Sequence, residues 1–150
     1  MSKYGKWVLT ALCAFWCLVI FSFSLSPAEA SAETSGEVLG FYHNFQKSFP
    51  FLPTLTGRTV RKMAHFMEFL VLGVLASATF RVHGFSHGWL MAPASVLLVA
   101  TADEIIQIFV PGRGPHVRDV LLDFAGGVCG ILLFYGLLFL ALYIKGKKTE

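Results

Sequence analysis

The chain has 150 residues, of which 55% are hydrophobic and 14% are charged, and its formal net charge is +3. Soluble domains carry about 25% charged residues, so this deficit and the long apolar runs indicate an integral membrane protein. The small positive charge and the lack of a nucleic-acid-binding sequence motif argue against a nucleic-acid partner. The length suits one domain, residues 1–150.

Four apolar stretches are long enough to cross a bilayer, which needs about 20 residues. They cover residues 7–25, 64–80, 88–109 and 120–144. Ionisable residues interrupt them only near their ends. We therefore expect an all-α fold, a four-transmembrane-helix bundle with both termini on the same side of the lipid bilayer.

The first stretch also has features of a secretory signal peptide, because Ala28-Glu29-Ala30 and Ala30-Ser31-Ala32 resemble cleavage sites. Its 19 apolar residues exceed the roughly 7 to 15 of a signal peptide. This length favours a retained span, and cleavage stays open as the alternative.

The orientation rests on the first span, because lysines and arginines are equally numerous on the two sides. Lys3 and Lys6 precede this span, and Glu29, Glu33 and Glu37 follow it. The first span usually dominates topology. We expect both termini in the cytoplasm and the opposite end outside it.

Residues 26–60 form the longest connection. Residues 26–36 are small and polar, which predicts a flexible segment. Residues 41–53 are rich in aromatic side chains and predict either a short interfacial helix, ended by Pro50 and Pro53, or a loop packed over the bundle.

Ionisable and amide side chains gather at one end of the last three spans, three or four positions apart, so those of each span share a helix face. They are Arg61, His65 and Glu68 in the second span, Asp103, Glu104 and Gln107 in the third, and Asp119 and Asp123 in the fourth. Polar groups within a membrane usually turn toward one another or toward water. The spacing predicts one polar pocket, open at the outer membrane surface.

The loop after the third span holds Arg113 between two glycines. Pro111 and Pro115 restrict its backbone, whereas Gly112 and Gly114 permit turns with positive φ. A guanidinium held there can grip a carboxylate or phosphate with two parallel hydrogen bonds. The alternative is that it neutralises one of the neighbouring acids, Asp103, Glu104 or Asp119.

Several roles are open to these polar residues. Ligand binding is expected of Arg61, His65, Glu68, Asp103, Glu104, Gln107, Arg113 and Asp119. General acid/base catalysis would fall to His65, Glu104 and Asp119. A divalent cation would be held by His65, Glu68, Glu104 and Asp119, with Asp123 as a further ligand. A plain ion-pair network that fixes the bundle is the remaining interpretation, and no cofactor is assigned.

Two other patterns concern packing. Gly126 and Gly130 form a G-x-x-x-G motif in the fourth span, which permits close approach of another helix. Cys13, Cys17 and Cys129 lie in apolar runs without a histidine nearby. They predict neither a zinc site nor a disulfide framework.

With these motifs in this order, the chain resembles the VanZ-like family of small bacterial membrane proteins. The matching segments are F-S-F-S-L-S-P-A-E-A-S-A-E-T-S at residues 21–35, R-K-M-A-H-F at residues 61–66, D-E-I-I-Q-I-F-V-P-G-R at residues 103–113, and Asp119 with Gly126 and Gly130. The family usually carries Asn at the position of Asp123, so no role is carried over to that residue. The resemblance implies a bacterial cell envelope protein, linked in some members to low-level teicoplanin resistance, without an established reaction.

Three functions compete on this basis. The first is a pocket that binds an anionic lipid, a cell-wall precursor or an amphiphilic glycopeptide antibiotic. The second is a membrane enzyme that acts on a phosphate- or acyl-linked envelope lipid. The third is a small carrier or carrier subunit, which the lack of internal repeats disfavours.

Overall fold

The computed structural model of the chain describes residues 3–114 and 116–147, most of which lie in five helices. The helices are α1 (Lys3–Ser24), α2 (Ala28–Ser48), α3 (Gly57–His83), α4 (Gly88–Ile108) and α5 (Val117–Lys147). Within the described residues, four helices, α1, α3, α4 and α5, are long and apolar enough to cross a membrane. The expectation of an all-α, four-span bundle is confirmed.

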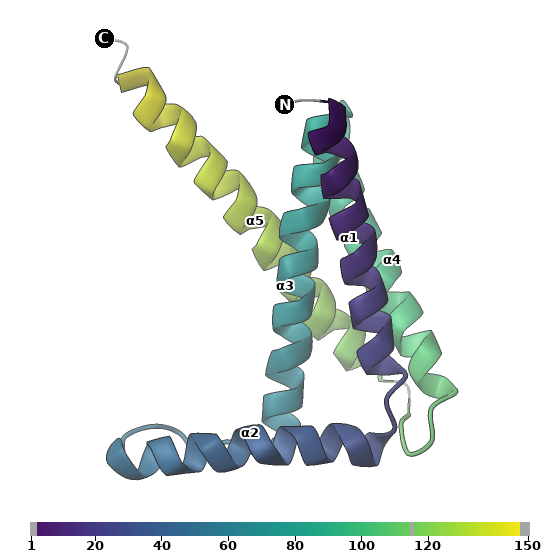
Figure 1. Ribbon diagram of the computed structural model, residues 1–150, viewed down its shortest axis with the longest axis vertical. Coiled ribbons are helices and arrows are strands. Elements are labelled where there is room, and N and C mark those ends of the chain that lie inside the picture. Colours follow the sequence, from purple (N-terminus) through teal and green to yellow (C-terminus); the bar gives the residue numbers. More distant parts are fainter. Residues whose placement is uncertain (1–2, 115, 148–150) are drawn as a thin grey trace.

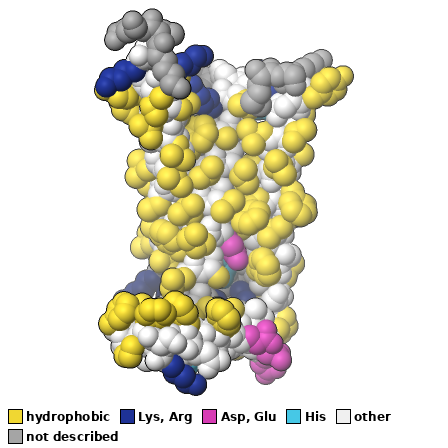
Figure 2. Space-filling view, turned by 60° about the vertical axis from the view of Figure 1, so that its left-hand side comes forward, with side chains coloured by type: hydrophobic (Ala, Val, Ile, Leu, Met, Phe, Trp, Pro, Cys, Tyr) yellow, Lys and Arg dark blue, Asp and Glu magenta, His cyan; other side chains and the backbone are white. Residues whose placement is uncertain are grey.

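The two ends of the bundle differ. Helix α1 begins and α5 ends at one end, while α2 and the α4–α5 loop lie at the opposite end (Figure 1). On the face shown in Figure 2, apolar side chains form a belt between these ends, and most of the charged side chains lie above and below it. This distribution is typical of a multi-pass membrane protein. We call the end that carries α2 the α2 end.

The bundle is built on the contact between α3 and α5, where glycines let two backbones touch. A Cβ atom at Gly126 would collide with the backbone oxygen of Phe66, and one at Gly130 would collide with that of Leu70. Small residues permit such approach in membrane helices, where packing drives association. The G-x-x-x-G motif therefore faces α3 within the bundle.

Helix α1 joins this pair through polar contacts as well as apolar ones. The Trp16 indole donates a hydrogen bond to the backbone oxygen of Glu68, with an N···O distance of 2.8 Å. At the other end of α1, Thr10 Oγ1 lies 2.9 Å from His83 Nε2. These contacts fix the position of α1 along the axis of α3. They therefore also fix the position of Ser24 at the α2 end.

Helix α2 lies across the foot of the bundle and begins earlier than the sequence suggested (Figure 1). The prediction of a flexible segment over residues 26–36 is wrong, because α2 runs from Ala28. Alanine is the strongest helix former, Glu29 favours the first turn of a helix, and Pro27 is compatible with a helix start.

Of the two alternatives left open for residues 41–53, the helical one is observed as far as Ser48, and the exposed side chains of α2 suit an interfacial position. Val38, Phe41 and Phe45 are exposed and lie three or four positions apart, so they form one apolar face. Apolar side chains gather on the side of α2 next to the belt (Figure 2). An amphipathic helix of this kind lies in the plane of the membrane interface.

Candidate functional site

A polar cavity of about 390 Å³ opens at the α2 end, between the start of α3, the end of α4, the α4–α5 loop and the start of α5. Its ionisable lining residues are Arg58, Arg61, Lys62, His65, Glu104, Arg113, His116, Arg118, Asp119 and Asp123. Arginine and lysine thus supply five cationic side chains against three carboxylates. The cavity lies in the size range of small-molecule sites, about 300 to 1,000 Å³.

The structure brings most of the expected ligand-binding residues around this cavity. Those that line it are Arg61, His65, Glu104, Gln107, Arg113 and Asp119. Two others lie elsewhere. Glu68 lines a neighbouring groove, and Asp103 is fully buried behind the cavity wall.

Asp103 is held by a hydrogen-bonded network that joins α1 to α4. One of its carboxylate oxygens accepts a hydrogen bond from Ser24 Oγ, and the other accepts one from Gln107 Nε2 at 2.8 Å. Gln107 Nε2 also donates to Ser24 Oγ at 3.3 Å. The sequence placed Asp103 and Gln107 on one helix face, but Ser24 was missed, since three alternating serines close the first span without distinguishing one of them.

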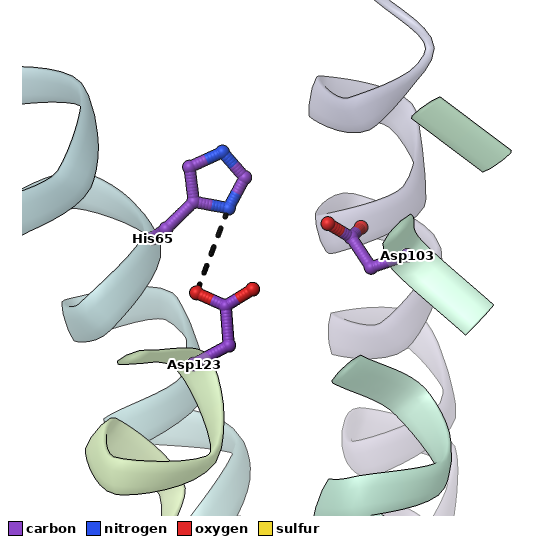
Figure 3. Close-up of side chains that lie close together, drawn as sticks. All are labelled: His65, Asp103 and Asp123. Carbon is purple, nitrogen blue, oxygen red and sulfur yellow. Dashed lines mark ion pairs between the residues drawn. The ribbon is translucent and has the colours of Figure 1, made fainter. Parts of the chain in front are cut away.

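His65 projects from α3 toward acids on two helices. Its Nδ1 atom lies 4.0 Å from Glu68 Oε2 on the same helix and 4.0 Å from Asp123 Oδ1 on α5 (Figure 3). All three atoms are buried, and none has a hydrogen-bond partner among the described residues. Asp123, excluded from the ligand-binding prediction, thus stands opposite His65.

The remaining two acids hold structural elements in place. Glu104 Oε2 accepts a hydrogen bond from the backbone N–H of His116 at 2.9 Å, which fixes the loop that leads into α5. Asp119 Oδ1 forms an ion pair with Lys62 Nζ at 2.8 Å, which joins α5 to α3. Each carboxylate therefore has one oxygen bound to the protein, and both side chains still line the cavity.

The α4–α5 loop presents Arg113 to the cavity. Gly112 has a φ of 76°, which favours glycine, whereas Gly114 has no positive φ; Pro115 lies outside the described residues. Arg113 Nη2 donates to the backbone oxygen of Phe23 at 3.4 Å, and its Nε atom is buried without a hydrogen-bond partner among the described residues.

The charge of Arg113 is not consumed by the neighbouring acids. Among the described residues, no ion pair joins it to Asp103, Glu104 or Asp119. Burial, followed by the like charge of Arg61, lowers the pKa of the Arg113 guanidinium. Because the usual pKa of a guanidinium lies far above neutral pH, it stays charged at neutral pH. An anion in the cavity would relieve both effects.

An apolar groove of about 340 Å³ adjoins the polar cavity, where α2 crosses the end of the bundle. Its walls come from the end of α1, from α2 and from α3, through side chains that include Phe23, Val38, Val60 and Ala64. The groove and the polar cavity share Arg61, His65 and Arg113 as lining residues. A basic site and an apolar site are therefore continuous at this end of the molecule.

Comparisons with known proteins bear on the whole chain. No curated protein and no solved structure gives a significant match. A family model described as VanZ/LLP1 matches residues 8–141, a stretch that begins in α1, ends in α5 and contains every residue of the polar cavity. The chain therefore belongs to the VanZ/LLP1 family, as its sequence motifs suggested.

Proposed function

We propose that this membrane protein binds an anionic envelope lipid, with the headgroup in the polar cavity and part of an acyl chain in the adjoining groove. The main support for the proposal is the state of Arg113. This half-buried cation faces the cavity without an acidic partner among the described residues. A guanidinium recognises phosphate or carboxylate through paired hydrogen bonds.

The balance of charge in the cavity supports an anion. Five basic side chains face three carboxylates, and one of those carboxylates, Asp119, already has Lys62 as its partner. The surplus of positive charge attracts an anionic group, and the low dielectric at a membrane surface strengthens that attraction.

The shape of the site supports an amphiphile over a free anion. The apolar groove shares three residues with the polar cavity, so one molecule with a charged head and a hydrocarbon tail fits both. The cavity, about 390 Å³, suits a lipid headgroup or the head of a lipid-linked precursor. Sequestration of such a lipid would give the connection to glycopeptide sensitivity that the family resemblance implies.

The proposal places the α2 end outside the cytoplasm. The support is the sequence around the first span, with Lys6 before it and Glu29, Glu33 and Glu37 after it. The lipids within reach of the site are then those of the outer leaflet of a bacterial cell membrane.

The test is lipid retention by the purified protein, measured by native mass spectrometry with phosphatidylglycerol and with phosphatidylcholine of the same chains. Wild type is expected to retain the anionic lipid preferentially. Arg113→Ala should weaken that retention by about tenfold, the effect of losing a charged hydrogen bond. Arg81→Ala removes the same charge at the opposite end of the bundle and should change nothing. Equal retention by wild type and Arg113→Ala would refute the proposal.

A second candidate, a membrane enzyme acting on a phosphate- or acyl-linked envelope lipid, is favoured by one observation. His65 lies 4.0 Å from two carboxylates and lines the cavity, as a general acid or base would. Lipid extracts incubated with wild type or His65→Ala protein separate the two functions. A product formed only by wild type supports catalysis, and unchanged lipids support binding alone.

A further inference from the structure

Three helices bring metal-binding side chains together at the inner side of the cavity. His65 of α3, Asp103 of α4 and Asp123 of α5 each direct a donor atom inward (Figure 3), and these donor atoms lie within 4.8 Å of one another. His65 Nδ1 and Asp123 Oδ1 are 4.0 Å apart, which is too far for a hydrogen bond. Two ligands of one metal ion, each bonded at about 2.0 to 2.2 Å, lie roughly 3 to 4 Å apart.

Among the described residues, neither of these two carboxylates is paired with a lysine or an arginine. Asp103 is 0% exposed and Asp123 is 1% exposed. The hydrogen bonds to Asp103 come from a hydroxyl and an amide, both neutral, and Asp123 Oδ1 has no hydrogen-bond partner among the described residues. Charge in such a setting is usually paired or bound to a metal. Lysine does not supply the pairing, because Lys62 is bound to Asp119.

We propose that His65, Asp103 and Asp123 hold a divalent cation. One imidazole nitrogen and two carboxylate oxygens suit an ion such as Mn²⁺ or Zn²⁺. Ser24 and Gln107 fix the Asp103 carboxylate by hydrogen bonds, as outer residues commonly do for metal ligands. His65 and Asp123 also line the cavity, so an ion held by them would adjoin the space where the proposed headgroup lies.

The site gives the proposed function a second element of anion recognition, a metal ion that a phosphate oxygen can reach. This role in headgroup recognition rests on the proposed function, but binding of the ion itself needs no lipid. The test therefore uses the metal alone, and its failure is distinct from a failure of lipid retention.

Purified full-length protein in detergent, stripped with a chelator, is titrated with Mn²⁺, and the free ion is followed by electron paramagnetic resonance. Mn²⁺ is chosen because thiolates select softer metals, so the three cysteines do not compete. Wild type is expected to bind one ion per chain. Asp123→Asn and His65→Gln should each bind at least tenfold more weakly. Glu37→Gln, which removes an acid from the exposed surface of α2, should match wild type.

Size-exclusion chromatography establishes that each variant stays monodisperse, and His65→Gln decides the matter should Asp123→Asn fail to fold. The proposal is overturned if wild type binds no Mn²⁺ at millimolar concentration. It is also overturned if His65→Gln binds the ion as tightly as wild type, or if Glu37→Gln weakens binding as much as His65→Gln does.

Discussion

At the scale of single residues, Ser24 links the first span to the polar cluster. Its hydroxyl donates to the Asp103 carboxylate at a site where both side chains are 0% exposed. A buried carboxylate that loses a donor is left partly unsatisfied, and no water replaces the donor in a packed interior. The last turn of α1 therefore belongs to the site.

Replacement of this hydroxyl should lower stability. Ser24→Ala is expected to reduce the free energy of unfolding by about 1 to 3 kcal/mol, the cost of an unsatisfied buried polar group. Ser22→Ala is the matched control, because Ser22 is exposed and its hydroxyl donates to the backbone oxygen of Val19; its effect should stay within about 0.5 kcal/mol. Denaturation of detergent-purified protein, followed by circular dichroism, measures both. Equal stability of the two variants would remove Ser24 from the site.

At the scale of elements, the α3–α5 contact sets the geometry of the cavity. His65 and Asp123 face each other because glycines one turn further into the membrane bring the two helices close. Where α5 passes beyond these glycines, it leans away from the bundle (Figure 1). The close contact is thus confined to the half of α5 that carries the site.

A methyl group at this contact should separate the two helices. Gly130→Ala is expected to cost about 1 to 3 kcal/mol or more, because the added Cβ meets the backbone of α3 rather than a movable side chain. At Gly136, also in α5, an added Cβ has no neighbour within 4 Å among the described residues. The Gly136→Ala control should be neutral or should stabilise the helix by up to about 1 kcal/mol. Thermal unfolding measures both, and a Gly130→Ala variant as stable as Gly136→Ala would contradict the account.

The first elements were the hardest to predict from sequence. Long apolar runs predicted the four spans, because hydropathy over about 20 residues leaves few alternatives. The start of α2 was not predicted, since serine, glycine and glutamate in residues 28–36 suit a loop and a helix alike. The helix is stabilised because its apolar face packs against the bundle and the membrane interface. Neither of these partners can be recognised from the local sequence.

In the whole molecule, the polar groups gather at one end of the bundle, so the orientation of the chain in the membrane decides which side the polar cavity faces. The polar cavity, α2 and the acids of α2 lie at one end, while the start of α1 and the end of α5 lie at the other (Figure 1). The sequence predicted convergence of the polar residues because helical spacing put them on single faces at one depth. The spacing did not predict which of these side chains are neighbours: Asp103 accepts a hydrogen bond from Ser24, and Asp123 lies opposite His65.

Cysteine labelling tests the proposed sidedness. Gly114→Cys lies in the α4–α5 loop, where the nearest neighbour of an added Cβ among the described residues, apart from those adjacent in the chain, is the His116 ring at 3.9 Å. An impermeant thiol reagent should label it in intact cells. Ser86→Cys, in the α3–α4 connection at the opposite end, should react only after permeabilisation, and wild type gives the background of the native cysteines. Labelling of Ser86→Cys in intact cells, with Gly114→Cys protected, would reverse the orientation.

Photo-cross-linking locates the anionic headgroup that we propose lies in the cavity at the α2 end. A phosphatidylglycerol with a photoreactive group in its head is incorporated with the protein into nanodiscs, and cross-linked peptides are identified by mass spectrometry. Adducts are expected to concentrate in residues 58–65 and 104–119, and to be lost with Arg61→Ala/Arg113→Ala. Adducts spread evenly over both ends of the bundle, and unchanged in that double variant, would contradict this position of the headgroup.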